Sequence, residues 1–218
     1  MDAWAIPARK IDAEIRNFEN ACPFPEGEIT RMANRRRILR HLPKKSIGAE
    51  IGVFRGHFSE MICNVVAPRK LYLIDPWTKS GETFGWGKEY TNFGALKTAD
   101  ARDESILRAR RGGCSEVVVI EEGFPACAGQ IAEKLDWVYL DASHKFEATL
   151  AELQRVAVIV KDDGVIAGDD FAINPESMHH GVFQAVHAFI RETDWCLIDC
   201  AHANQYALKR FETHGRLP

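Results

Sequence analysis

The fold of this chain is indicated most clearly by one stretch, Ile47-Gly48-Ala49-Glu50-Ile51-Gly52-Val53-Phe54-Arg55-Gly56. Apolar residues surround one acid, and two glycines then lead into a run with helical periodicity from His57 to Val66. A buried strand that breaks on glycine and restarts as a helix is typical of the ligand-binding turn of α/β proteins. The spacing differs from Gly-x-Gly-x-x-Gly, so the dinucleotide fingerprint is missing, and a plain strand-to-helix turn is the alternative.

Two residue types in this turn indicate the kind of ligand. Gly52 and Gly56 let the backbone approach a ligand closely, and Gly52 is able to adopt a positive φ. Glu50 lies at the carboxyl end of the strand. An acid there suits a cationic or hydroxyl-bearing ligand better than a pyrophosphate.

Strand and helix signals alternate through most of the chain. Near-continuous apolar strands separated by helical patterns predict a parallel sheet with helices on both faces, that is, a three-layer Rossmann-like α/β fold. The predicted strands are 47–52, 71–75, 117–120, 137–141 and 164–168, and the predicted helices cover 57–66, 95–111, 126–135, 146–157 and 182–189.

The end of the chain departs from this alternation. Residues 195–200 and 205–209 both have strand character, and only four residues separate them. Four residues cannot form a crossover helix, so these two strands must pair antiparallel. The sequence therefore predicts seven strands, mostly parallel, with a C-terminal antiparallel hairpin.

The segment before the first strand is predicted to be helical. Ile11, Ile15 and Phe18 share one helical face, and a second helix is expected to end before Pro43. The basic cluster at residues 35–37 is interpreted as a solvated helix face. The predicted domains are a helical cap over 1–43, which covers the ligand site or forms a dimer contact, and the main domain over 44–218.

The connection over residues 76–94 is long and rich in aromatic residues and glycine. It leaves the carboxyl end of the second strand, on the side where α/β proteins bind ligands. Long loops are usually functional or disordered. We expect this one to be a lid over a substrate, with disorder as the alternative.

Composition narrows the class of protein. The 218 residues, 46% of them hydrophobic, fit one domain of ordinary to large size, and the net charge of -3 argues against a dedicated nucleic-acid binder. No membrane-spanning run and no signal peptide is recognisable, so a cytoplasmic protein is expected. The six cysteines form no Cys-x-x-Cys pair and are expected to be reduced thiols.

Carboxylates follow all five parallel strands, and the carboxyl ends of parallel strands lie on one rim of a sheet. Glu50, Asp75 and the turn at Glu122-Gly123-Phe124 belong to the early strands. Asp75 comes about 20 residues after the glycine turn, the usual distance for an acid that binds a ribose. Acids are common at strand ends, but five in succession predict a ligand on this rim that is cationic or rich in hydroxyls.

The later strands carry a second group of acids. Asp141, Asp169 and Asp170 make an oxygen-rich site that suits Mg²⁺, Mn²⁺ or Ca²⁺, and His144 is placed to act as a general base there. The alternative is that these acids only cap helices and end strands, and that His144 is a surface histidine. The other histidines singled out, at positions 179, 180, 187 and 202, are interpreted as structural or exposed.

Together these motifs resemble class I S-adenosylmethionine-dependent methyltransferases, from about Ile47 to Arg210. The resemblance implies that residues of four strand ends bind S-adenosylmethionine: Glu50, Gly52, Phe54, Gly56, Asp75, Gly123, Phe124 and Asp141. The segments 136–144 and 164–171 are similar to the metal-dependent O-methyltransferases of macrolide and aminocoumarin sugars. This implies Mg²⁺ on Asp141, Asp169 and Asp170, with His144 or Asp141 as the catalytic base.

The function expected from this resemblance is methyl transfer to a hydroxyl of a small molecule, a sugar or another natural-product-like acceptor. No nucleic acid or membrane partner is expected, and a homo-oligomer is left open. Three alternatives remain: a metal-independent methyltransferase, a protein that binds S-adenosylmethionine without turnover, and a sugar-nucleotide transferase. The last explains neither the glycine turn nor the terminal hairpin.

Overall fold

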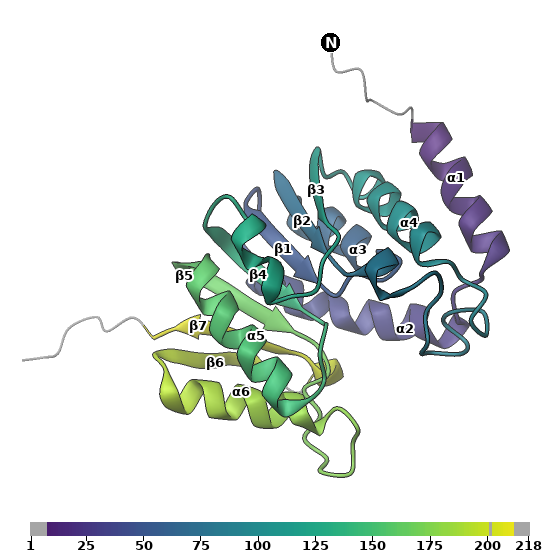
Figure 1. Cartoon of the computed structure of the whole chain (residues 1–218). Helices are drawn as coiled ribbons and strands as arrows, with labels where there is room; N and C mark the ends of the chain where they lie inside the picture. Colours follow the sequence, from purple (N-terminus) through teal and green to yellow (C-terminus); the bar gives the residue numbers. More distant parts are fainter. Residues whose placement is uncertain (1–7, 201, 212–218) are drawn as a thin grey trace, which may run out of the picture.

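The computed structural model describes residues 8–200 and 202–211 and shows a three-layer α/β fold (Figure 1). A seven-stranded sheet lies between two layers of helices, with strand order β3-β2-β1-β4-β5-β7-β6. The predicted fold class is confirmed. The strands are β1 (Ile47–Ile51), β2 (Lys70–Ile74), β3 (Glu116–Ile120), β4 (Leu135–Leu140), β5 (Val160–Gly168), β6 (Trp195–Cys200) and β7 (Tyr206–Arg210).

The pairing of the strands follows the predicted pattern. The first five strands are parallel to one another, and β1 lies between β2 and β4. The last strand, β7, pairs antiparallel with both β5 and β6. The C-terminal hairpin therefore extends the sheet beyond β5, and the carboxyl ends of β1 to β5 remain on one rim.

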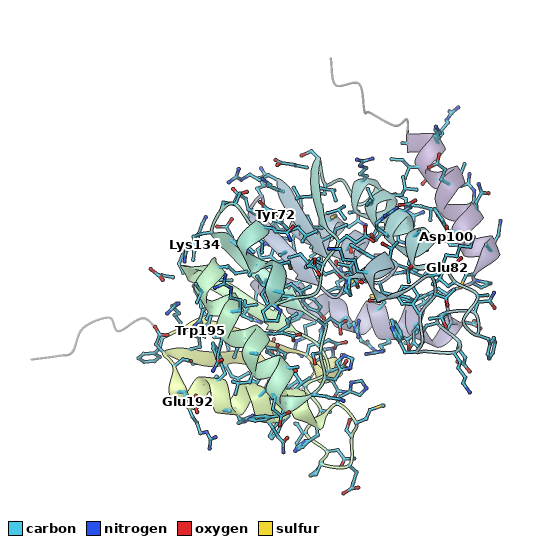
Figure 2. All side chains as sticks on the ribbon, viewed as in Figure 1. Tyr72, Glu82, Asp100, Lys134, Glu192 and Trp195 are labelled. Carbon is cyan, nitrogen blue, oxygen red and sulfur yellow. The ribbon has the colours of Figure 1, made fainter. Side chains whose placement is uncertain are left out.

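Helices cover the two faces of the sheet because side chains alternate along each strand. Leu153 and Val156 of α5 and Val182 of α6 pack on the face that carries Ile51 and Val138. The opposite face is covered by α3, α4 and η1, and side chains fill the space on both sides (Figure 2). The covering helices are α3 (His57–Val66), α4 (Thr98–Arg111), α5 (Phe146–Ile159), α6 (His180–Glu192) and the 3-10 helix η1 (Arg36–His41).

The segment before β1 begins with α1 (Ala8–Ala21), as predicted, which packs on α4 through Ile11, Ile15 and Leu107. It continues with α2 (Glu26–Arg35), which approaches the short 3-10 helix η4 (His202–Asn204) after β6. The division into a cap over 1–43 and a main domain over 44–218 stays a prediction. Residues 1–7, 201 and 212–218 of these ranges lie outside the described residues.

Two predicted helices have different forms in the structure. The single helix expected before Pro43 is α2 followed at once by η1, so the chain tightens to a 3-10 helix from Arg36 onward. The helix predicted over residues 126–135 is wrong: only the 3-10 helix η3 (Ala126–Gln130) forms, and β4 already begins at Leu135. Gly129 weakens a helix at this point, and pairing of Leu135 with β5 extends the chain.

None of the described helices is both long and apolar enough to cross a membrane. The six cysteines form no disulfide among the described residues, and four of them are buried. Their reduced state stays a prediction.

Candidate functional site

The glycine turn after β1 forms the centre of the rim. Gly52 has a φ of 84°, and its amide donates to the carbonyl of Ile74 at 2.9 Å. A Cβ on Gly52 would lie 1.9 Å from the carbonyl oxygen of Asp141. Gly56 has a φ of 75° and precedes the first residue of α3. Only glycine therefore fits at position 52, where the turn meets the end of β4.

Asp75, at the end of β2, holds the glycine turn in place. Its Oδ2 accepts hydrogen bonds from the amides of Val53 and Phe54, both at 3.0 Å, and its Oδ1 accepts one from the amide of Trp77, also at 3.0 Å. The Trp77 indole in turn donates to the carbonyl of Phe54 at 2.8 Å. Burial raises the pKa of Asp75, although the three amides act in the opposite direction. The side chain thus lies beside the predicted cofactor turn, and its contact with a ribose stays a prediction.

Glu50 lies beneath the turn and is only 1% exposed. Its Oε2 accepts a hydrogen bond from the Ser59 hydroxyl on α3. Burial raises the pKa of Glu50 to about 8, the Ser59 hydrogen bond lowers it, and the charge of Asp141 raises it further. The predicted acid is therefore a largely protonated carboxyl at neutral pH, one hydrogen bond away from α3.

The end of β3 carries Gly123 and Phe124, which the resemblance places beside the cofactor. Phe124 is half-buried and packs against the core on the α5 and α6 face. The preceding acids bind the segment after β2: Glu121 accepts from the amide of Thr78 at 3.0 Å, and Glu122 pairs with Lys79. These acids therefore tie β3 to the segment after β2, and roles for Gly123 and Phe124 in cofactor binding stay predictions.

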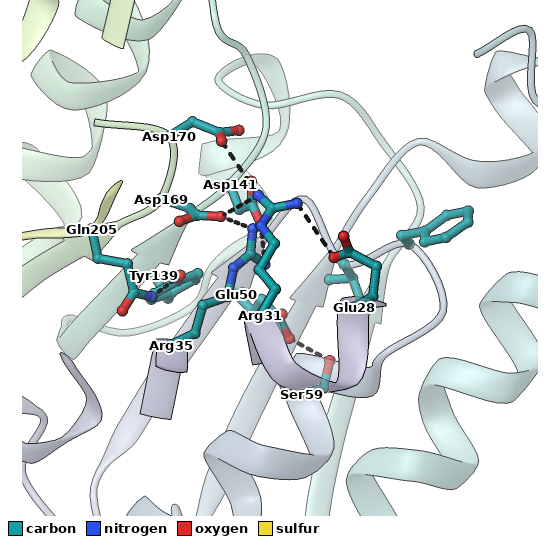
Figure 3. A network of polar contacts seen from close by, with 12 residues as sticks. Glu28, Arg31, Arg35, Glu50, Ser59, Tyr139, Asp141, Asp169, Asp170 and Gln205 are labelled. Atoms are coloured by element: carbon teal, nitrogen blue, oxygen red, sulfur yellow. Dashed lines mark hydrogen bonds and ion pairs between the residues drawn. The ribbon is translucent and has the colours of Figure 1, made fainter. Parts of the chain in front are cut away.

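The acids after β4 and β5 come together as predicted. Oxygens of Asp141, Asp169 and Asp170 lie within 4.8 Å of one another, which is the donor type and spacing of a candidate metal site (Figure 3). The strands fix these positions, because the amide of Asp141 donates to Ile51 at 2.8 Å and that of Asp169 to Leu140 at 3.1 Å. Asp170 has a φ of 59°, which turns the chain away from the sheet.

Two arginines of α2 hold these three carboxylates. Arg35 lies 3.3 Å from Asp141 Oδ2 and also pairs with Asp169 Oδ2. Arg31 lies 3.2 Å from Asp169 Oδ2 and 3.4 Å from Asp170 Oδ1 (Figure 3). The interpretation of residues 35–37 as a solvated face is therefore wrong for Arg35, which is buried, whereas its two neighbours are exposed.

Two histidines approach the other oxygen of Asp170. His144 Nε2 is 2.9 Å from Asp170 Oδ2 and 3.9 Å from Asp141 Oδ1, and His179 Nδ1 is 3.2 Å from Asp170 Oδ2. Asp141 and Asp170 raise the pKa of His144 to about 9. Burial disfavours the charged form of Asp170, yet His144, His179 and Arg31 hold its pKa below the usual range. His179, interpreted from the sequence as structural or exposed, thus has a partner at the spacing of a ligand group.

Comparison with known proteins identifies the family. A family model described as a methyltransferase domain matches residues 49–171, which is more than half of the chain. The match begins within β1 and ends just after Asp169 and Asp170, so it includes the glycine turn and the acidic cluster. The chain belongs to this methyltransferase family.

Solved methyltransferases share the fold at low sequence identity. The O-methyltransferase from Bacillus cereus, solved with SAH, aligns with a TM-score of 0.59 and 12% identity over 96% of this chain and 94% of that chain. TomG, the O-methyltransferase of tomaymycin synthesis from Streptomyces achromogenes, was solved with SAM. It aligns with a TM-score of 0.52 and 12% identity over 92% of this chain and 87% of that chain.

An rRNA methylase from Streptococcus thermophilus aligns comparably, with a TM-score of 0.53 and 12% identity over 83% and 95% of the two chains. Relatives with different kinds of acceptor therefore have the same fold, and the fold by itself does not select an acceptor. No curated protein matches the chain.

Three residues at the site of this methyltransferase were not expected there from the sequence: Arg31, Arg35 and His179. The two arginines are four residues apart, which places both on one face of a helix, and this spacing was the available signal. Nothing local marks which carboxylates they meet, because Arg31 and Asp169 are 138 residues apart in the sequence.

The predicted lid over residues 76–94 packs against the glycine turn of the methyltransferase. It begins with the 3-10 helix η2 (Trp77–Ser80) and ends near a bridge between Thr83 and Lys97. Trp77 and Phe84 are buried, and Phe84 and Trp86 lie 5.1 and 5.0 Å from the ring of Phe54 in the glycine turn. Closure of this loop over an acceptor stays a prediction.

A cavity of about 360 Å³ lies elsewhere, between α1 and α4, and is lined by Glu14, Phe18, Asp103 and Leu107 among others. None of its lining residues belongs to the site at the strand ends. Its walls are mainly apolar, so we assign no catalytic role to it.

Proposed function

We propose that this protein is an S-adenosylmethionine-dependent O-methyltransferase that acts on a hydroxyl group of a small molecule. The observation that carries the proposal is the meeting of the glycine turn with the end of β4, where the Asp141 carbonyl touches Gly52 and His144 follows on the same loop. A donor held at the turn would place its methyl group beside a carboxylate and an imidazole. The Bacillus cereus and Streptomyces relatives, solved with SAH and SAM as O-methyltransferases, support the same chemistry.

The residues proposed to bind the cofactor lie at the ends of β1 to β4. The glycine turn, with Gly52, Phe54 and Gly56, offers a backbone that a ligand can approach closely, and Phe54 adds an aromatic ring. The other proposed contacts are the carboxyls of Glu50, Asp75 and Asp141 and the backbone at Gly123 and Phe124. When bound, S-adenosylmethionine supplies a methyl group on a positively charged sulfur.

The proposed proton acceptor is His144, with Asp141 as the alternative. When bound, S-adenosylmethionine would supply the methyl group to the acceptor oxygen and leave as SAH. Neutral His144 takes the proton that the hydroxyl loses. Because Asp141 and Asp170 raise the pKa of His144 to about 9, the neutral form is a minority at pH 7 and becomes dominant only above about pH 9.

The predicted divalent cation does not fit the arrangement of the described residues. Asp141, Asp169 and Asp170 have the donor type and the spacing that a hard cation requires. Each of the three carboxylates, however, already has a guanidinium partner from Arg31 or Arg35. This observation favours the metal-independent methyltransferase among the alternatives, and no step of the proposed reaction passes through an ion.

The acceptor is proposed only by class. A sugar or another natural-product-like hydroxyl compound stays the expected acceptor, without a nucleic acid or a membrane as partner. Residues 76–94, with the exposed rings of Trp86 and Phe93, are the proposed contact surface for the body of such a molecule.

A turnover assay tests this function. The purified protein is incubated with S-adenosylmethionine and a panel of sugars, phenols and glycosides, and SAH release and the added methyl are measured by mass spectrometry from about pH 6 to 10. We expect kcat/KM to rise with pH and to level above about 9, the pKa of His144. The variant His144→Ala should lose this rise, whereas Lys145→Ala, its exposed neighbour, should keep it.

Two results would contradict the proposal. The first is an absence of SAH binding by calorimetry. The second is methyl transfer to nitrogen or carbon, with no transfer to any hydroxyl in the panel.

A further inference from the structure

We propose that Arg31 and Arg35 supply the positive charge in the acidic cluster of Asp141, Asp169 and Asp170. Their guanidinium groups occupy the position at which a divalent ion would otherwise bind the three carboxylates. They hold Asp141 and Asp169 in position for methyl transfer and make the reaction independent of metal. This inference rests on the proposed function as far as catalysis is concerned. Its central claim, that the cluster excludes a divalent ion, is testable without an acceptor.

The contacts place at least one guanidinium group against each carboxylate, and Asp169 contacts both. Arg35 reaches Asp141 at 3.3 Å and also pairs with Asp169, and Arg31 bridges Asp169 at 3.2 Å and Asp170 at 3.4 Å. Two permanent positive charges therefore face three carboxylates. A guanidinium group does not lose its proton in proteins, so these partners persist at any working pH.

Burial makes the Arg35 contact hard to exchange for an ion. The side chain of Arg35 is 8% exposed and that of Asp169 is 0% exposed. A divalent ion on Asp141 and Asp169 would push the Arg35 charge off its partners while keeping it buried beside the new positive charge. A buried charge that loses its partners is strongly unfavourable, so binding of the ion would be opposed.

Two buried polar atoms of this pair have no partner among the described residues. They are Arg35 Nε, a donor, and Asp169 Oδ1, an acceptor. Buried polar groups without a partner are uncommon and call for a ligand or an ordered water. A metal ion would satisfy only the carboxylate oxygen and would leave the arginine donor unpaired, whereas a water molecule is able to pair with a donor or with an acceptor. The unpaired atoms therefore do not favour a metal ion over water.

The helix that carries the arginines presents them as a unit. Arg31 and Arg35 are four residues apart on α2, so both face the strand ends (Figure 3). Glu28, one turn before Arg31, lies 3.4 Å from its guanidinium group and helps to orient it. The ring of Phe58 on α3 lies 5.9 Å from the Arg35 guanidinium carbon. The basic residues that follow, Arg36 and Arg37, are exposed and provide matched controls.

Metal binding is the first measurement. The full chain is stripped of metal with EDTA, dialysed, and titrated with MgCl₂ and with MnCl₂ by calorimetry, with thermal unfolding recorded in parallel. We expect no saturable binding to the wild type or to the control Arg36→Ala/Arg37→Ala. The double variant Arg31→Ala/Arg35→Ala frees the three carboxylates and should gain a saturable Mn²⁺ site and a metal-dependent rise in Tm.

Turnover is the second measurement, made once an acceptor is in hand. Wild-type activity should be the same with EDTA and with Mg²⁺. Arg35→Ala should lower kcat by about 10- to 100-fold, the range expected for loss of a hydrogen bond to a charged group, and Arg35→Lys should recover only part of it because lysine lacks the fork. Circular dichroism and SAH affinity of each variant separate this loss from misfolding and from failure of the proposed cofactor site.

Defined results would overturn the inference. Saturable binding of Mg²⁺ to the wild type would do so, as would EDTA-sensitive activity that Mg²⁺ restores. A wild-type Mn²⁺ site that His179→Ala removes would also overturn it, because the ion would then lie on His144, Asp170 and His179, a second group whose donor atoms lie within 4.8 Å of one another. Arg31→Ala, at a side chain 41% exposed, serves as the milder variant should the double one fail to fold.

Discussion

At the scale of single residues, burial sets the protonation state of Glu50, because it raises the pKa of the carboxyl. Its carboxyl lies under the glycine turn with one hydroxyl partner and almost no solvent. Burial favours the neutral form, and a cationic donor bound nearby would favour the charged form. The residue is therefore placed to change protonation when the proposed cofactor binds.

The pH dependence of stability tests the state of Glu50. Its pKa is raised from 4.5 to about 8, so between these values the native chain keeps a proton that the unfolded chain has lost. The free energy of unfolding should therefore fall as pH rises through this window, with a contribution of up to about 1.4 kcal/mol per pH unit from this group. The variant Glu50→Gln should lack this contribution in urea denaturation between about pH 5 and 8.

The control for this prediction is Glu147→Gln, at an exposed glutamate in the first turn of α5. It should keep the pH dependence of the wild type. Parallel curves for Glu50→Gln and the wild type would show that Glu50 is ionised in the folded state.

At the scale of elements, the turn between β1 and α3 is the part of the site that tolerates least change. It is fixed from two sides, by the Asp75 carboxylate at the end of β2 and by the backbone of Asp141 after β4. Three strand ends thus determine one turn. The backbone at Gly52 and Gly56 already has positive φ values without a ligand. The turn therefore does not have to change conformation to bind a cofactor.

Adding one methyl group to this turn tests its role. In Gly52→Ala, the new Cβ would lie 1.9 Å from the Asp141 carbonyl at a φ of 84°, so the turn and the end of β4 must separate. We expect a loss of about 2 kcal/mol or more in the free energy of unfolding, together with weaker SAH binding by calorimetry.

The same substitution in α2 is the control. A Cβ on Gly27 meets nothing within 4 Å, so Gly27→Ala should stabilise the chain by about 0.5 to 1 kcal/mol and leave SAH binding unchanged. Equal effects of the two substitutions on stability and on SAH binding would show that the turn has no special role.

At the scale of the whole molecule, a buried ionic network connects the glycine turn with the outer helices. Arg55 of the turn and Glu104 of α4 are both fully buried and lie 2.6 Å apart. Arg108 extends the network, because it pairs with Glu104 at 2.7 Å, with Glu60 of α3 at 3.1 Å and with Glu19 of α1 at 2.8 Å. The position of α1 is therefore linked to the rim of the sheet through charges as well as through apolar contacts.

Breaking this network should be costly. Glu104→Gln leaves the buried charge of Arg55 without its partner, and we expect a loss of about 3 to 5 kcal/mol in urea denaturation. Asp103→Asn, at the exposed neighbour whose one ion-pair partner among the described residues is Arg102, should change stability by less than about 1 kcal/mol. A change of similar size in both variants would show that the network does not stabilise the fold.

The sequence by itself determined the sheet, the glycine turn and the meeting of Asp141, Asp169 and Asp170. These features follow from local patterns: apolar runs of strand length, glycines that break them, a connection too short for a crossover helix, and the rule that parallel strands end on one rim. The same local reasoning was wrong over residues 126–135, where pairing of Leu135 with β5 outweighs helix preference.

Only the tertiary structure decided what neutralises the acidic cluster. Arg35 and Asp141 are 106 residues apart in the sequence. His179 contacts Asp170 from the end of a loop, and the hydrophobic pattern of the sequence does not predict the path of a loop. Side-chain patterns report neighbours within a helical turn or along a strand, whereas a charge pair across the chain depends on how α2 folds back over the finished sheet. The electrostatic character of the site, and with it the metal-independent chemistry proposed here, depends on that packing.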